Sequence, residues 1–213
     1  MTGGGRAMTE QAKAPRKTAY HHGDLRQALL AAAETELAER GVEGFTLRGV
    51  AKRAGVSHAA PAHHFKDTNA MLTALAASAA ERFAGALRNR QARAAGDARS
   101  RLVAIGVGYV EFALGNPALF RLMFGSQRPD ARDPHLDHHA SAAFMILVEG
   151  VGALRGDDPL ASARGRADVA AAWSVVHGIA NLLIAGRMGF IKPMLDADFE
   201  ATVAAIVGRA LPL

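Results

Sequence analysis

Apolar residues recur at helical spacing along most of this chain, and no segment shows the strict alternation typical of a β-strand. Aromatic residues make up only 6% of the 213 residues, whereas alanine occurs in runs, a composition that suits close-packed helices better than β-sheets. The chain has no Cys, which excludes a disulfide scaffold and any cysteine-ligated metal site. The sequence therefore predicts an all-α protein.

Apolar spacing and capping residues together predict about nine helices. They are expected over residues 24–40, 46–54, 58–65, 69–93, 102–113, 117–124, 144–154, 169–183 and 199–210. At about 1.5 Å per residue, the helix over 69–93 would span roughly 35–40 Å, enough to connect two lobes. The segment 125–137 is rich in Pro, Asp and Arg and is expected to be a loop.

The first nineteen residues differ in composition from the rest. They carry four Lys or Arg, one Glu and little apolar content, so residues 1–19 are predicted to be a disordered basic arm. The opening residues contain neither a long apolar run nor a cleavage-site pattern, which favours a cytoplasmic protein over a secreted one. The net charge of +5 favours an anionic partner.

One segment needs a comparison with membrane helices. Residues 169–186 hold no formally charged side chain, but they contain Ser174, His177 and Asn181 in mid-run. Eighteen residues are near the lower limit for a membrane span. A helix buried within a soluble assembly is the favoured interpretation, and we expect no membrane partner.

Residues 46–65 predict a helix, a tight turn and a second short helix. Thr46 is suited to cap the first helix, Gly55 can take the positive φ of the turn, and Ser57 can cap the next helix. Pro61 falls in the first turn of that helix and disfavours helical torsions at Ala60. In a DNA-binding protein the first helix would brace across the backbone while residues 58–65 enter the major groove. Similar helix pairs also occur in ordinary helical proteins.

Several sequence pieces occur here in a recognisable order. They are Gly41 to Thr46, the run Val50-Ala51-Lys52-Arg53-Ala54-Gly55-Val56-Ser57, and His63-His64-Phe65-Lys66-Asp67. Through these pieces, residues 20–75 resemble the DNA-binding domain of the tetracycline-repressor (TetR) family of bacterial transcriptional regulators. Asn116-Pro117 and the later Trp173, His177 and Gly178 look like the subgroup with a Trp-His-Gly C-terminal domain.

The resemblance implies a domain order and a DNA-binding surface. Residues 20–67 would form a three-helix helix-turn-helix domain, and residues 68–213 a helical domain for effector binding and dimerisation. The predicted DNA-binding residues, with added charge from Arg48 and Lys66, are Thr46, Arg48, Ser57, His58, Ala59, Ala60, Ala62, His63 and Lys66. This chain departs from the family at Ala62, where an aromatic residue is usual, and at Thr68, where Lys is frequent.

A ligand cavity would need a lining from the helices after residue 68. Trp173 and His177 lie at i and i+4 on one helix face, where His177 could be the polar group that orients a ligand or simply a packed side chain. The predicted ligand-binding residues are Phe83, Phe112, Phe120, Met123, Phe124, Phe144, Trp173 and His177. The core packing of these aromatic residues is the alternative.

Neither a catalytic set nor a cofactor motif is apparent in the sequence, so we expect a protein that is not an enzyme and carries no cofactor. His135, His138 and His139, with Asp133 and Asp137, could ligate a metal ion in the loop, but a solvated polar loop is favoured and no metal is expected.

The predicted function is that of a transcriptional regulator. As the resemblance implies, it would bind a pseudo-palindromic operator as a homodimer, joined through helices at about 167–186 and 198–211, and an unidentified small-molecule effector would release it. Repression is the common mode of the family, and activation stays open. The alternatives are a constitutive DNA-binding regulator without an effector and a helical enzyme or carrier that has lost DNA binding.

Overall fold

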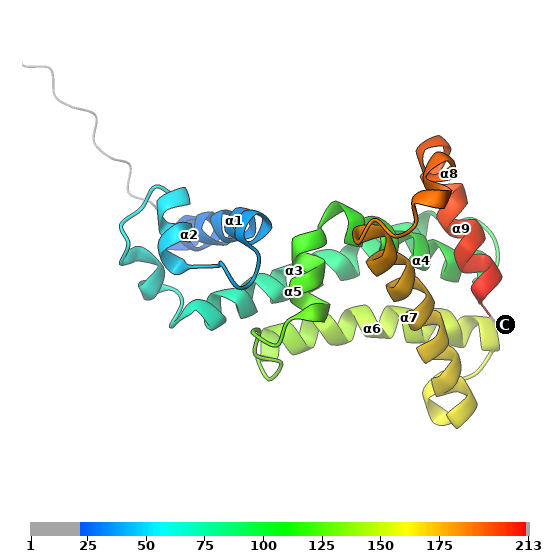
Figure 1. Cartoon of the computed structure of the whole chain (residues 1–213). Helices are drawn as coiled ribbons and strands as arrows, with labels where there is room; N and C mark the ends of the chain where they lie inside the picture. Colours follow the sequence, from blue (N-terminus) through cyan, green and yellow to red (C-terminus); the bar gives the residue numbers. More distant parts are fainter. Residues whose placement is uncertain (1–21, 212–213) are drawn as a thin grey trace, which may run out of the picture.

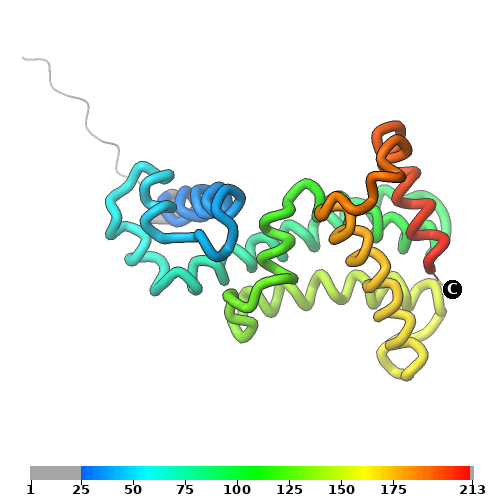
Figure 2. The backbone as a smooth tube through the Cα atoms, viewed as in Figure 1, coloured from blue at the N-terminus to red at the C-terminus, as the bar shows by residue number. Residues whose placement is uncertain are grey.

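The computed structural model describes residues 22–211, and within that range every regular element is a helix. The prediction of an all-α fold is confirmed. Figure 1 shows a small lobe that contains α1 and α2 and a larger lobe that contains α4 to α9. The backbone trace in Figure 2 shows α3 leading from one lobe to the other. The predicted arm over residues 1–19 lies outside the described residues.

The described part of the chain contains nine α-helices and three short 3₁₀ helices. The α-helices are α1 His22–Arg40, α2 Leu47–Arg53, α3 Thr68–Arg93, α4 Ala98–Gly115, α5 Pro117–Gly125, α6 Pro134–Arg155, α7 Ala163–Ile184, α8 Lys192–Ala197 and α9 Phe199–Ala210. The 3₁₀ helices are η1 Ala60–His63, η2 Pro159–Ala161 and η3 Gly189–Ile191.

Capping side chains explain where several helices begin. The Asp67 carboxylate accepts a hydrogen bond from the Ala70 N–H at 2.8 Å and starts α3, and Asp97 caps α4 in the same way through the Ser100 N–H. Asp133 accepts bonds from the first amides of α6, with Pro134 in the first helical position.

Two clusters of buried apolar residues form the interior. The first joins α1, α2, Phe65 and the first part of α3, and it also takes in Leu119 and Leu122 from α5. The second begins at Phe83 in α3 and includes residues from α4 to α7 and α9. The two clusters therefore meet along α3, and α5 contributes buried side chains to both.

The nine α-helices are not the nine that the sequence predicts. The element expected over 58–65 is only a 3₁₀ helix over Ala60–His63. Pro61 has no N–H to donate and restricts the preceding residue, so Ser57 to Ala59 form a turn instead of helix. The sequence prediction also missed α8.

The helix expected over 144–154 begins ten residues earlier, at Pro134. His135, His138 and His139 therefore lie on α6, and the prediction of a loop through residue 137 is wrong at its end. The Asp133-Pro134 pair explains the early start, because an aspartate cap followed by proline favours a helix start.

Within residues 22–211, α7 is the single helix long and apolar enough to cross a membrane, with a mean hydropathy of 1.4. The pair α4 and α5 meets the criterion only if counted as one span despite a bend of 108°. Core helices of soluble proteins meet the same criterion. In this fold, Val169, Ala172 and Val176 of α7 are buried in the second cluster.

Candidate DNA-reading surface and ligand cavity

The helix-turn-helix begins with a capped helix. The Thr46 hydroxyl accepts a hydrogen bond from the Gly49 N–H at 3.0 Å, as the sequence predicts for a cap of α2. Val50 and Ala51 are fully buried, and Val50 joins α2 to the first cluster. Gly55 then takes a φ of +67°, which reverses the chain before Ser57.

The second element of the motif is fastened by two buried residues. The Pro61 carbonyl accepts hydrogen bonds from the His64 N–H at 3.0 Å and the Phe65 N–H at 2.9 Å, and both Pro61 and Phe65 are buried. The Arg26 guanidinium lies 5.3 Å from the centre of the Phe65 ring. One side of η1 is thus held against the small lobe, which leaves the other side outward.

The predicted DNA-binding residues all retain access to solvent. Eight of them are exposed, and Ala60 is half-buried. Ser57, His58 and Ala59 form the turn that leads into η1, and Ala62 and His63 lie on η1 itself. His64 is half-buried with its ring 6.4 Å from that of Phe65, which fits a packing role better than a reading role.

A clamp that the sequence analysis did not identify holds α1 against α2. Arg53 Nε donates to Glu36 Oε2 at 2.6 Å, and its NH1 group donates to Glu39 Oε1 at 2.9 Å. The Glu36 side chain is buried, and the hydrogen bonds from Arg53 hold the pKa of Glu39 below its usual range. A Cβ on Gly49 would lie 2.0 Å from Glu36 Oε1, so the absence of a side chain there lets the carboxylate pass.

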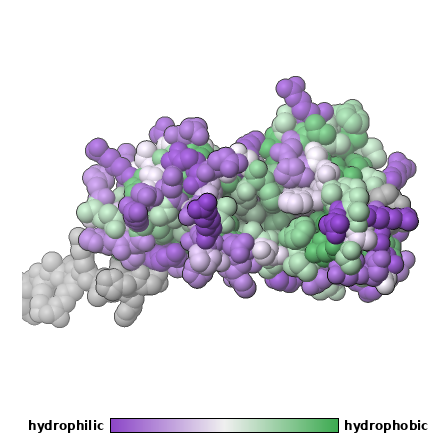
Figure 3. Space-filling view, turned by 90° about the horizontal axis from the view of Figure 1, so that it is seen from below, coloured by the Kyte–Doolittle hydropathy of each residue, from purple (hydrophilic) through white to green (hydrophobic). Residues whose placement is uncertain are grey.

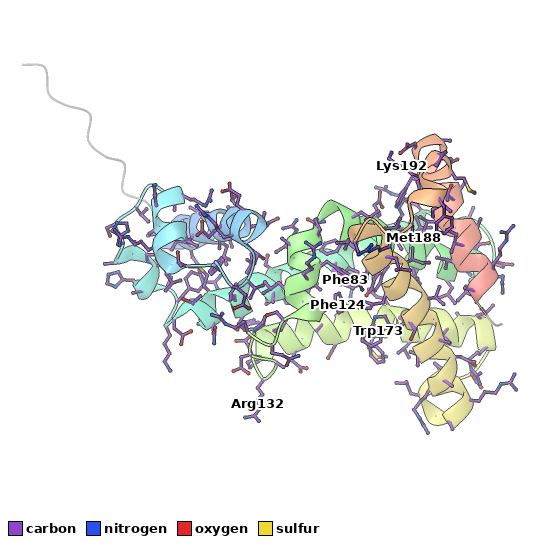
Figure 4. The ribbon with its side chains drawn as sticks, viewed as in Figure 1. Phe83, Phe124, Arg132, Trp173, Met188 and Lys192 are labelled. Atoms are coloured by element: carbon purple, nitrogen blue, oxygen red, sulfur yellow. The ribbon has the colours of Figure 1, made fainter. Side chains whose placement is uncertain are left out.

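The larger lobe contains a cavity of about 160 Å³ between α3, α4, α5, α6 and α7, closed at one end by Val207 and Leu211. Figure 4 shows Phe83, Phe124 and Trp173 gathered there from three different helices. The lining is mostly aliphatic and aromatic, and its polar side chains are those of Tyr109 and Trp173.

Five of the eight predicted ligand-binding residues line this cavity, namely Phe83, Met123, Phe124, Phe144 and Trp173. Phe112 and Phe120 do not line it, because they are buried in the second cluster next to Phe83 and Tyr109. His177 lies behind the wall, with its ring 5.3 Å from the ring of Phe124.

The two polar lining residues and His177 form one hydrogen-bonded group. Trp173 Nε1 lies 3.3 Å from the Tyr109 hydroxyl, and that hydroxyl lies 2.8 Å from His177 Nδ1. Since an indole N–H can only donate, the Tyr109 oxygen accepts from Trp173 and its proton is available to His177. His177 then carries its own proton on Nε2 in the neutral ring.

Burial shifts both ionisable groups toward their neutral forms. Desolvation raises the pKa of the Tyr109 hydroxyl above its usual range, and desolvation lowers the pKa of His177. Tyr109 is not among the ligand-binding residues predicted from the sequence, because it falls on the apolar stripe of its helix. The signal was present, since the chain has only two tyrosines and a buried phenol needs a hydrogen-bond partner.

The alternative of a metal site at the histidines near residue 135 gains no support. The rings of His138 and His139 on α6 meet edge to face with their centres 5.1 Å apart. Across residues 22–211, no group of three or more His, Cys, Asp or Glu side chains is placed to hold a metal ion.

Two family matches cover much of the chain. The family described as bacterial regulatory proteins of the tetR type matches residues 29–75, and the family described as the tetracyclin repressor-like C-terminal domain matches residues 102–206. The first match contains the whole helix-turn-helix, and the second contains most of the cavity lining. No curated protein matches the chain.

Solved structures with the same fold span nearly the whole chain. A protein of unknown function from Rhodococcus sp. RHA1 is 33% identical, with a TM-score of 0.74, and the match covers 92% of this chain and 100% of that one. A TetR family regulator from Marinobacter aquaeolei VT8 is 16% identical (TM-score 0.62; 88% and 95% covered). FadR from Bacillus subtilis, in complex with stearoyl-CoA, is 17% identical (TM-score 0.63; 88% and 98% covered).

Proposed function

Because this chain belongs to the TetR family of bacterial transcriptional regulators, we propose that it is a repressor that binds a pseudo-palindromic operator as a homodimer and is released by a small-molecule effector. Residues 20–67 serve as the DNA-binding domain, and residues 68–213 as the domain for effector binding and dimerisation. A cytoplasmic location, without catalysis and without a cofactor, follows from this role. Membership of the Trp-His-Gly subgroup is part of the same proposal.

The observation that carries the proposal is the outward face of η1. Pro61 and Phe65 hold this short element to the small lobe, while His63 on η1 and Ser57 and His58 in the turn before it stay exposed. Such a rigid and exposed segment after a capped helix can enter the major groove, which is about 12 Å wide. The exposed Arg48 and Lys66 add positive charge for phosphate contacts.

Small exposed residues on two helices support the dimer. Only 28% of the apolar window of α7 is buried, so a large part of that helix stays accessible to solvent. Its uncovered positions include Ala167, Ala170 and Ser174, and α9 exposes Ala201 and Ala205. Small side chains let helices of two protomers approach closely, and the two reading segments would then lie about 34–36 Å apart, one on each half-site.

The route from cavity to DNA runs through α5. Met123 and Phe124 line the cavity, while Leu119 and Leu122 of the same helix are buried in the small lobe's cluster. Arg82 of α3 donates to Glu34 of α1 at 2.7 Å and to Asn116, the cap of α5, at 2.8 Å. A ligand that shifts α5 therefore acts on the small lobe, and a difference in affinity of about 1–3 kcal/mol between two dimer states suffices for release.

The stearoyl-CoA bound to the Bacillus subtilis FadR supports the proposal of a small-molecule effector, since that structure shares this fold. It does not define the chemistry of the effector here. The direction of control, repression relieved by the ligand, comes from the family.

Gel-shift titration of the purified protein on DNA from upstream of its own gene tests the proposal. We expect a salt-sensitive specific complex, and His63→Ala should weaken it by about 1–3 kcal/mol. His138→Ala is the matched control, because it removes an exposed histidine of α6 far along the chain from η1. A protein that forms no specific complex with this DNA contradicts the proposed function.

A further inference from the structure

The cavity in the larger lobe offers no partner to a charged ligand. Of its 19 lining residues, all within the described range 22–211, none is Asp, Glu, Lys, Arg or His. Burying an isolated charge among such groups costs far more than apolar contacts return. A carboxylate, a phosphate or an ammonium group would therefore have to stay outside.

The exposed edge of the cavity also has no Lys or Arg on the adjacent helical turns that could pair with an acidic ligand. Ala140 and Trp173 line the cavity and are also exposed, Trp173 to 39%, so they mark its solvent side between α6 and α7. Within four residues of either position along its own helix there is no Lys or Arg. An anionic group held at this edge meets no Lys or Arg on these turns of α6 and α7, where the titratable side chains are those of Asp137, His138, His139 and His177.

The size and walls of the cavity favour one ring. A volume of about 160 Å³ is close to that of engineered apolar cavities of ~150 Å³ that take up benzene. Phe83, Phe124, Phe144 and Trp173 supply aromatic walls, and aromatic rings prefer edge-to-face contact with one another. A single ring with a short substituent fits both the volume and the walls.

The hydrogen-bonded group on the wall has room for one more partner. The Tyr109 oxygen accepts from Trp173 Nε1 and its proton is available to His177 Nδ1, which leaves one lone pair unused. The Trp173 bond is long, at 3.3 Å, so its N–H is only weakly engaged and can be shared with an incoming acceptor. A hydroxyl group satisfies both sites, since it donates to the Tyr109 oxygen and accepts from Trp173.

We propose that the effector of this protein is an uncharged, single-ring compound with one hydroxyl group, a small phenol or a comparable alcohol, held by Tyr109 and Trp173 in the aromatic cavity. This inference rests on the proposed function in one respect, namely that binding of the compound releases the DNA. The binding itself is a property of the cavity and can be measured without DNA.

Isothermal titration calorimetry of the full chain with four matched probes tests the chemistry. The probes are para-ethylphenol, ethylbenzene, para-ethylbenzoate and para-ethylbenzylammonium. We expect para-ethylphenol to bind about tenfold more tightly than ethylbenzene, because one hydrogen-bonded group is added. The two charged probes should bind at least about a hundredfold more weakly than para-ethylphenol. Trp173, the chain's only tryptophan, gives a second readout through its fluorescence.

Two variants locate the bound hydroxyl. Tyr109→Phe keeps the ring and removes the oxygen, so para-ethylphenol should lose about tenfold in affinity while ethylbenzene changes by less than about twofold. Ser174→Ala is the control, since Ser174 follows Trp173 on α7 but its hydroxyl donates to the Ala170 carbonyl at 2.7 Å and does not line the cavity. It should leave all four affinities unchanged.

The outcomes separate this inference from the proposed function. Equal binding of the phenol and the hydrocarbon, tighter binding of either charged probe, or no binding of any probe overturns the inference, whatever the gel shift shows. Tight phenol binding with the expected effect of Tyr109→Phe supports it even if no operator complex forms, and in that case the proposed function alone fails. If para-ethylphenol binds but does not displace the operator DNA, the bound compound is not an effector, and that outcome also contradicts the inference.

Discussion

Gly49 lies where a side chain would meet a buried carboxylate. An Ala Cβ there would approach Glu36 Oε1 to 2.0 Å and force the carboxylate away from Arg53. Helix propensity alone favours Ala over Gly, yet we expect Gly49→Ala to destabilise the fold by about 1–3 kcal/mol because the α1–α2 contact is overpacked. Urea unfolding monitored by circular dichroism measures the change.

Gly85 provides the matched control for that substitution. It lies inside α3, and a Cβ added there meets no atom within 4 Å. Gly85→Ala should stabilise the protein by roughly 0.5–1 kcal/mol, since only the backbone entropy of the unfolded chain changes. If both Gly49→Ala and Gly85→Ala stabilise the protein, the Glu36 carboxylate can move aside without weakening the fold. That result would contradict a stabilising role of the clamp between Arg53 and Glu36.

His177 couples the cavity wall to pH. Desolvation lowers its pKa in the folded protein, so between that value and the unfolded value near 6.5 the unfolded chain binds more protons. Stability should therefore fall as the pH drops through about 6.5, and protonated Nδ1 can no longer accept from Tyr109. Urea midpoints measured from about pH 7.5 to about pH 5.5 give the slope.

The comparison for this slope uses two histidine variants. His177→Gln should flatten the pH dependence of stability, whereas His138→Gln, at an exposed position of α6, should leave it as in the parent protein. If the parent protein and His177→Gln lose stability equally over this range, the desolvation of His177 is not the cause.

Residue by residue, the sequence predicts surface chemistry better than buried partners. Local sequence patterns predict the cap at Thr46, the exposure of His58 and His63, and the aromatic cavity wall at Trp173. The bond between Tyr109 and His177 joins positions 68 residues apart, and Glu36 meets Arg53 across 17 residues. Such pairs depend on how helices cross, which local spacing does not encode.

At the scale of elements, α5 belongs to two interiors at once. Leu122 is fully buried in the cluster of the small lobe, although α1 and α2 are far from it in sequence. We expect Leu122→Ala to cost about 2–5 kcal/mol and to speed hydrogen exchange at the amides of α1 and α2. Hydrogen exchange with mass spectrometry locates the effect.

Met145→Ala on α6 serves as the control, because Met145 is 41% exposed and its truncation should change stability by no more than about 0.5 kcal/mol. Faster exchange confined to α5 and its neighbours in the large lobe after Leu122→Ala would argue against a shared interior.

Two of the errors in the predicted elements involve proline. At Pro61 the sequence pattern suggested a helix over residues 58–65 with the proline in its first turn, but the missing N–H and the restricted Ala60 leave only a 3₁₀ helix over Ala60–His63. At Pro134 the polar composition suggested a loop, whereas Asp133 and the proline together start α6. At Pro134 the prediction gave too much weight to the polar composition and too little to the position of the proline after Asp133. At Pro61 it gave too much weight to helical spacing.

At the scale of the whole molecule, the outward face of α7 decides whether two protomers join. In the view of Figure 3 the larger lobe shows apolar patches between polar side chains. Ala170→Arg places a charged side chain on the exposed face of α7, so the monomer should stay folded while the dimer separates. Light scattering during size-exclusion chromatography should report a monomer, and operator affinity should fall at least about a hundredfold.

Ser141→Arg, at an exposed position of α6, which is not one of the proposed dimer helices, is the matching control and should remain dimeric with unchanged DNA binding. A dimer that persists in Ala170→Arg places the protomer contact elsewhere.

The sequence predicted a small and a large lobe joined by a long helix, and the fold has that layout. The division of the chain after residue 67 stays a prediction. What local patterns could not supply is the sharing of α5, because nothing near Leu119 or Leu122 in the sequence indicates that they join the cluster of the small lobe, where α5 packs against α1.

That sharing limits how such a protein can be recombined. A chimera that grafts the reading head of another regulator onto residues 68–213 would keep Leu119 and Leu122 but lose the surface shaped to receive them. A functional hybrid would need compatible side chains on both sides of the join, so exchange of heads should succeed mainly between relatives whose α5 matches, and a graft that ignores α5 should yield an insoluble or unresponsive product.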